Sequence, residues 1–147
     1  MAKEFLNWDE TEKLIKELGG KIRAAGFQPT VIAPVPRGGW CVAAILAQIF
    51  NVKKTVGVSH QKKNGWVEVQ LSTENLKDEN ILLVEDCIET GKTLHAVEKE
   101  LIKTGANVKT ACIYVSSESN QEKKPDFYLD VREIPNFVWN YSTPTTQ

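Results

Sequence analysis

Apolar positions along the chain predict alternating helices and strands. Repeats every three or four residues predict helices, and the segments with this pattern are residues 7–25, 40–50 and 92–104. Short apolar runs or alternation predict strands, in residues 31–35, 55–59, 66–71, 81–84, 108–115, 127–131 and 137–140. Residues 61–65 and 85–91 between them are polar and predict loops. Strands that alternate with helices indicate an α/β fold with a mainly parallel sheet flanked by helices.

Two predicted loops directly follow buried strands, at residues 36–39 and 85–93. Right-handed crossovers bring the carboxyl ends of parallel strands to one edge of the sheet. Ligands of open α/β sheets bind at that edge. We therefore expect the functional site to be built from these two loops.

The loop at residues 85–93 has the composition of an anion site beside two carboxylates. It leads into a helix start, where unpaired N–H groups and the helix dipole favour a phosphate. Thr90 and Thr93 add hydroxyl donors, and Gly91 permits close backbone approach. Glu85 and Asp86 are acceptors for sugar hydroxyls or for the waters of Mg²⁺. The combination suits a sugar phosphate with a metal ion.

Two other interpretations fit parts of this loop. Its acidic residues and threonines would also suit a plain strand-to-helix junction, in which they only cap the helix. Gly91-Lys92-Thr93 matches the end of a Walker A loop, but that motif needs a glycine where this chain has Asp86. A Walker A loop is therefore excluded. The interpretation of residues 85–93 as a plain helix-capping junction stays open on composition alone.

Composition and charge narrow the class of protein. The chain has 147 residues, which predicts one domain over residues 1–147. Its net charge is −1, so the basic excess of a nucleic-acid binder is missing. Three cysteines without metal-ligand or redox spacing (Cys41, Cys87 and Cys112) indicate reduced thiols. The sequence shows no signal-peptide pattern and no bilayer-length apolar run, which predicts a cytoplasmic protein that does not bind membranes.

Residues 85–93, Glu-Asp-Cys-Ile-Glu-Thr-Gly-Lys-Thr, closely resemble the phosphoribosyl pyrophosphate (PRPP) signature of type I phosphoribosyltransferases. The resemblance implies that Glu85 and Asp86 contact the ribose hydroxyls, with Mg²⁺ as cofactor. It also implies that Thr90, Gly91, Lys92 and Thr93 hold the 5′-phosphate. Glu89 stands where family members place a carboxylate near the base, in a role of proton transfer.

Two further segments resemble parts of that family. Arg37 and Gly38 lie where its pyrophosphate loop would be, and Arg37 offers a charge-assisted fork to an anion. Residues 134–141 resemble the purine-binding hood of the hypoxanthine-guanine enzymes. There Phe137 would stack on the base, and Val138 would contact it through its backbone. Ordinary packing of a terminal strand is an equally good interpretation of this segment alone.

The resemblance leaves the acceptor base open. Purine-using members carry a lysine after the strand that ends near Val115, whereas this chain has Ser116 and Ser117. The tail, residues 142–147, also has no acidic residue of the kind that the hypoxanthine-guanine enzymes place near the purine. The hypotheses are an enzyme that transfers phosphoribosyl from PRPP to a 6-oxopurine in purine salvage, one for another acceptor, and a non-catalytic PRPP-binding regulator. The family resemblance further implies a homodimer or homotetramer.

Overall fold

The computed structural model describes residues 3–118 and 124–141. Its central layer is a parallel sheet of β2 (Val31–Pro34), β5 (Asn80–Val84) and β7 (Asn107–Ala111), in the order β2-β5-β7. β2 and β5 are apolar where they cross the core, as expected for strands covered on both faces, whereas β7 also carries the buried polar Thr110. The predicted α/β fold with a mainly parallel sheet is confirmed.

A second parallel sheet continues the first beyond the carboxyl ends of its strands. It consists of β6 (Cys87–Ile88), β8 (Tyr114–Ser116) and β9 (Asp130–Arg132). The Glu85 N–H donates to the Ala111 carbonyl at 3.0 Å, and the Ile113 N–H donates to the Asp86 carbonyl at 2.8 Å. The prediction of a plain loop at 85–91 is therefore wrong at β6. The predicted strand at 108–115 is divided, because Cys112 bonds instead to Phe127.

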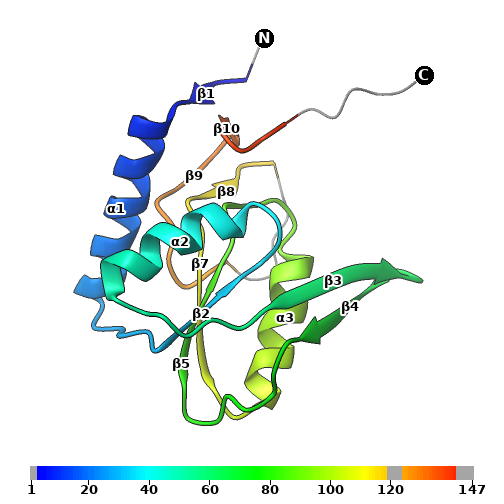
Figure 1. Cartoon of the computed structure of the whole chain (residues 1–147). Helices are drawn as coiled ribbons and strands as arrows, with labels where there is room; N and C mark the ends of the chain where they lie inside the picture. Colours follow the sequence, from blue (N-terminus) through cyan, green and yellow to red (C-terminus); the bar gives the residue numbers. More distant parts are fainter. Residues whose placement is uncertain (1–2, 119–123, 142–147) are drawn as a thin grey trace.

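Three helices cover the two faces of the central sheet. α1 (Trp8–Ala24) and α2 (Gly39–Phe50) pack on one face, and α3 (Lys92–Lys103) covers the other (Figure 1). α1 begins at Asn7, whose side chain accepts from the Glu10 N–H while the Glu10 carboxylate accepts from the Asn7 N–H. This reciprocal capping box fixes the start of the helix where the sequence predicted it. No helix among the described residues is long and apolar enough to cross a membrane.

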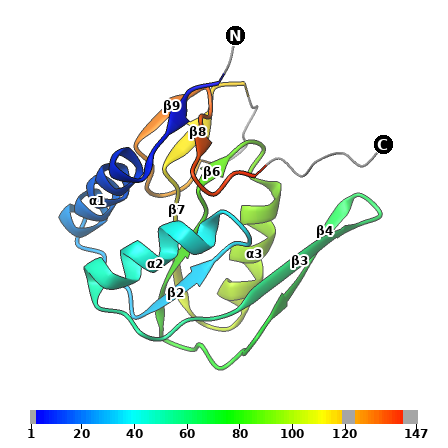
Figure 2. The ribbon, with the colours of Figure 1, turned by 45° about the horizontal axis from the view of Figure 1, so that its top comes forward.

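An antiparallel ribbon projects from the body beside α3 (Figures 1 and 2). It consists of β3 (Val58–Lys63) and β4 (Trp66–Leu71), which pair along their whole length. The predicted strand at 55–59 starts too early, since β3 begins at Val58, and the predicted loop at 61–65 is wrong at 61–63, which continue β3. The predicted strand at 66–71 is confirmed as β4. Asn64 and Gly65 have φ of 50° and 83°, which is the backbone of a two-residue hairpin turn. The Asn-Gly pair was the signal that the sequence offered for this hairpin.

The two ends of the described chain meet over the carboxyl edge of the sheet. β1 (Phe5–Leu6) pairs in parallel with β10 (Asn136–Phe137). Figure 2 shows both end segments beside β6, β8 and β9. The predicted C-terminal hood is therefore present, and the N-terminal strand belongs to it. The predicted strands at 127–131 and 137–140 are shorter and shifted, since only β9 and β10 lie in that region.

Candidate functional site

The first wall of the site is the turn that joins β2 to α2. The Val35 N–H donates to the Val84 carbonyl at 2.8 Å, so this turn is joined to the end of β5. A Cβ added to Gly39 would overlap the Val84 carbonyl oxygen, and one added to Gly38 would overlap the Asp86 carboxylate. Both glycines are needed because the start of α2 lies directly on the carboxyl end of β5.

The second wall is the acidic pair that follows β5. Glu85 and Asp86 are both half-buried and line a common cavity. The Asp86 carboxylate accepts from the Cys87 N–H at 2.7 Å through Oδ1, and from Trp139 Nε1 at 2.9 Å through Oδ2. These donors compensate the charge of a carboxylate that is partly removed from water.

Glu85 has a strongly shifted pKa. Burial, followed by the nearby charges of Asp86 and Glu89, raises the pKa of Glu85 to about 8. A group whose folded-state pKa lies above the ordinary value of 4.5 binds its proton more tightly in the folded protein. The free energy of unfolding therefore falls as the pH rises from about 4.5 to about 8.

We expect Glu85→Gln to remove this pH dependence, because a neutral amide has no proton to lose. In Mg²⁺-free buffer the wild type should lose on the order of 2 kcal/mol more stability than the variant between pH 5 and pH 8.5. Denaturant unfolding at the two pH values measures the difference. Glu17→Gln, a change at an exposed site on α1, is the matched control and should keep the wild-type slope. Equal slopes for wild type and Glu85→Gln would contradict the raised pKa.

The third wall is the start of α3. Gly91 is the N-cap with φ of 79°, a left-handed conformation that glycine adopts without steric cost. The His95 N–H donates to the Gly91 carbonyl as the first bond of the helix, so the N–H groups of the first turn point outward. Thr90, Gly91 and Thr93 line the cavity, whereas the exposed Lys92 does not.

The second and third walls line a cavity of about 720 Å³ together with the hood, whereas no residue of the turn before α2 is among the lining residues. The signature loop supplies one side, and the hood supplies Ile134, Pro135, Asn136, Phe137, Asn140 and Tyr141. The N-terminal segment adds Lys3 and Phe5, which the sequence analysis missed. β1, the strand in this segment, has only two residues, which is too short for a periodic pattern that would predict it from the sequence. Among the described residues that line the cavity, Lys3 is the only cation.

The hood residues singled out from the sequence lie in different surroundings. Phe137 lines the cavity but is only 1% exposed, and its ring stacks on Trp139 at 4.8 Å between centroids. Val138 is half-buried and is not among the lining residues. The ring stack identifies Trp139 as a further residue of this region, which the sequence analysis did not assign to the site.

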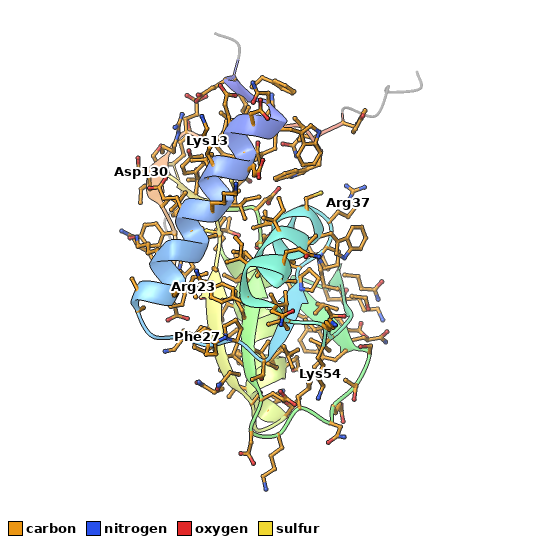
Figure 3. All side chains as sticks on the ribbon, turned by 60° about the vertical axis from the view of Figure 1, so that its left-hand side comes forward. Lys13, Arg23, Phe27, Arg37, Lys54 and Asp130 are labelled. Atoms are coloured by element: carbon orange, nitrogen blue, oxygen red, sulfur yellow. The ribbon has the colours of Figure 1, made fainter. Side chains whose placement is uncertain are left out.

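Three further residues of interest, Arg37, His60 and Cys87, lie in different surroundings. Arg37 is exposed, and Figure 3 shows its side chain beyond the start of α2, outside the set that lines the cavity. His60 is half-buried, and its Nε2 lies 3.2 Å from the Pro36 carbonyl oxygen. Burial raises the pKa of the Cys87 thiol well above its ordinary value. Cys87 therefore stays protonated at neutral pH and suits packing better than nucleophilic attack.

The positions that bear on the acceptor base either do not line the cavity or lie outside the described residues. Ser116 ends β8 and Ser117 follows it, and neither lines the cavity. Lys124 is exposed and also lies outside the lining. Lys123 and the tail at 142–147 fall outside the described residues.

The arrangement can hold an anion and a polyol side by side. The start of α3 offers N–H and hydroxyl donors for a phosphate, and the acidic pair next to it offers acceptors for hydroxyls. Within residues 3–118 and 124–141, no three histidine, cysteine or acidic side chains form a metal cluster. Two adjacent carboxylates nevertheless fit Mg²⁺, which binds through one or two carboxylates together with substrate phosphates.

The phosphoribosyl transferase domain family matches residues 1–145. The chain belongs to this family. Among solved structures, a purine phosphoribosyltransferase from Pyrococcus horikoshii is 29% identical, with a TM-score of 0.80 over 97% of both chains. A xanthine-guanine-hypoxanthine phosphoribosyltransferase from Helicobacter pylori is 19% identical, with a TM-score of 0.75 over 92% of both chains, and shows the shared fold. The predicted phosphoribosyltransferase fold and the resemblance to its purine-using members are confirmed.

Two curated relatives are named for another base, orotate. An orotate phosphoribosyltransferase from Maricaulis maris is 33% identical over 108 residues, which are 73% of this chain and 54% of that protein. One from Nitratiruptor is 30% identical over 107 residues, 73% of this chain and 52% of that protein. The chain thus spans about half the length of these relatives. The family is established, and the acceptor base is not fixed by similarity.

Proposed function

We propose that this chain, acting as one domain over residues 1–147, transfers the phosphoribosyl group of PRPP to a nucleobase and releases pyrophosphate. The observation that carries the proposal is the cavity of about 720 Å³ between the signature loop and the hood. Its volume falls within the range of small-molecule sites, about 300–1,000 Å³. One wall has donors for a phosphate and the opposite wall is made by the hood, as a two-substrate transfer requires.

The sugar phosphate would lie along the signature loop. Thr90, Gly91, Lys92 and Thr93 would hold the 5′-phosphate at the start of α3, where the helix dipole favours an anion. Arg37 and the bare Gly38 backbone would hold the pyrophosphate at the neighbouring turn. Both turns lie at the carboxyl edge of the sheet, which supports placing the two ends of PRPP there.

The acidic pair would serve the ribose and Mg²⁺. Glu85 and Asp86 line the cavity next to the phosphate loop, so they are placed to accept from ribose hydroxyls. The same carboxylates would hold Mg²⁺ directly or through its waters. Bound Mg²⁺ supplies positive charge that stabilises the leaving pyrophosphate.

In the reaction, a nitrogen of the base forms a bond to C1 of the ribose while the bond from C1 to the pyrophosphate oxygen breaks. The pyrophosphate leaves with the electron pair, and positive charge develops on the ribose ring. Asp86 would oppose that charge, as would Glu85 in its ionised form, and Arg37 would bind the leaving group. Glu89 lines the cavity and would take the proton that the base releases.

A 6-oxopurine is the first candidate acceptor. The purine phosphoribosyltransferase of Pyrococcus horikoshii matches this chain almost end to end, which supports that choice. Phe137 and Val138 would form the hood side of the base site. A pyrimidine carboxylate is the second candidate, favoured by the orotate phosphoribosyltransferases and by Ser116 in place of the lysine of purine-using members.

A nucleobase panel tests the proposal. The protein is mixed with PRPP, Mg²⁺ and hypoxanthine, guanine, xanthine or orotate in turn, and mass spectrometry detects nucleotide and pyrophosphate. Nucleotide from a 6-oxopurine supports the first candidate, and nucleotide from orotate alone supports the second. If no base reacts while calorimetry shows Mg²⁺-dependent PRPP binding, the chain is a PRPP-binding regulator and the proposed transfer is wrong.

Lys3 gives a separate prediction about the base. It is the only cation among the described residues that line the cavity, so we expect it to bind an oxygen on the base. Lys3→Ala should raise the KM for the reactive base about tenfold, the loss expected for a hydrogen bond to a charged group, and leave the KM for PRPP unchanged. Lys16→Ala, an exposed change on α1 outside the cavity, is the control. Unchanged base KM values in Lys3→Ala would rule out this contact.

A further inference from the structure

A hydrogen bond between side chains joins the hood to the signature loop. Trp139 Nε1 donates to Asp86 Oδ2 at 2.9 Å, across 53 residues of sequence. The other oxygen of the carboxylate accepts from the Cys87 N–H. Each oxygen of Asp86 therefore has its own donor, one from the loop and one from the hood.

The carboxylate is also confined sterically. An added Cβ at Gly38 would overlap the Asp86 carboxyl group, so the carboxyl group lies against the start of α2. The bulk of any other side chain at position 38 would displace it. Asp86 is thus held between the turn before α2, the backbone of its own loop and the indole of the hood.

The indole that contacts Asp86 is itself fixed by aromatic neighbours. The Phe137 ring stacks on Trp139 with an angle of 6° between the ring planes. Trp8 is the first residue of α1, and its ring centroid lies 6.1 Å from that of Trp139, with the two ring planes tilted against each other. Two hydrogen bonds hold the turn that contains Trp139. The Phe137 N–H donates to Asn140 Oδ1, and the Asn140 N–H donates to the Phe137 carbonyl. These contacts set the direction of the Nε1–H bond.

We propose that Trp139 is a positioning residue, which holds the Asp86 carboxylate in the orientation that receives the ribose of PRPP. The inference rests on the proposed function, because it assigns Asp86 to the sugar. The indole N–H is a directional donor to an ionised acceptor, and such bonds are stronger than those between neutral groups. The hood thereby acts on the sugar half of the site as well as on the base half.

Trp139→Phe tests the role of the N–H. Phenylalanine keeps an aromatic ring to stack on Phe137 but removes the donor to Asp86. We expect the KM for PRPP to rise on the order of tenfold, while the KM for the base stays within twofold. Trp66→Phe, which makes the same change on the exposed ribbon and does not touch Asp86 or the cavity lining, is the matched control and should leave both values unchanged. A uniform rise in both KM values, or no rise for PRPP, would overturn the proposal.

A second measurement reads the contact without any substrate. In ¹H–¹⁵N spectra the indole signal of Trp139 is assigned by its loss in Trp139→Phe. Its hydrogen exchange should be slower than that of the exposed Trp40 and Trp66, and Asp86→Asn should shift it. Exchange as fast as that of Trp40 would overturn the inference even if PRPP binds. If the wild type does not bind PRPP, the proposed function and the positioning role both fail, whereas a slow indole would still establish the hydrogen bond.

Discussion

Replacing Gly39 with alanine should lower the free energy of unfolding by about 3 kcal/mol. The new Cβ would overlap the Val84 carbonyl oxygen and would lie 3.5 Å from the Glu85 Cα. Both atoms belong to the backbone at the end of β5, so no side-chain rotation relieves the overlap. The start of α2 must move away from the sheet, which disturbs the buried contacts of Val42 and Ala43. Denaturant or thermal unfolding measures the loss.

The matched control is Gly20→Ala in α1. A Cβ at Gly20 would meet nothing within 4 Å, and Gly20 lies inside a helix, where alanine is favoured over glycine. This variant should be as stable as the wild type or up to about 1 kcal/mol more stable. If Gly39→Ala unfolds at the wild-type denaturant concentration, the close approach of α2 to β5 described above is wrong.

Asp86→Asn should lower kcat/KM for PRPP about 100-fold, with most of the loss in PRPP affinity. Asparagine has nearly the shape of aspartate but only one acceptor oxygen, whereas the Asp86 carboxylate serves two donors, the Cys87 N–H and Trp139 Nε1. The amide NH₂ group would therefore face one of these donors. The substitution also removes the negative charge that would oppose the charge on the ribose ring. Steady-state kinetics and calorimetry with PRPP and Mg²⁺ measure the two effects.

Asp130→Asn is a close control for this variant. Asp130 Oδ1 accepts from the N–H of the next residue, Val131, as Asp86 Oδ1 does from Cys87, but Asp130 is exposed and does not line the cavity. Figure 3 shows Asp130 on the opposite side of the view from Arg37. Its loss of charge should leave the kinetics unchanged. If Asp86→Asn matched this control in turnover and in PRPP affinity, the role assigned to Asp86 in sugar binding would be wrong.

Local patterns in the sequence are sufficient for the main elements of the sheet and helices. The repeat of Leu14, Leu18 and Ile22 predicted α1 closely, because one face of an amphipathic helix must reach the core. The apolar run at 81–84 likewise predicted β5, which is buried on both faces. Within the ribbon, the alternation at 66–71 predicted β4, whereas β3 was mispredicted, since it has no apolar alternation and only the turn at Asn64 and Gly65 marks it.

The residues of the candidate site also fall into two groups, those that a local sequence pattern revealed and those that it did not. The signature at 85–93 is contiguous, so its carboxylates, glycine and threonines could be recognised along the chain and lie together in the cavity wall. Lys3, Phe5 and Trp139 escaped recognition because they come from segments near the two ends of the described chain. Their approach to residues 85–93 depends on the pairing of β1 with β10, which leaves no local pattern.

The sequence by itself therefore determined the α/β class, the family and the position of the signature loop, since each depends on residues that are neighbours along the chain or on a helix face. The tertiary structure alone decided which side chains surround that loop. It placed Lys3 in the lining of the same cavity as the acidic pair, left Arg37 exposed outside that lining and turned the Trp139 indole to Asp86. The physical reason is that these contacts join residues far apart in sequence, and their geometry is fixed only when the core packs and the end strands pair.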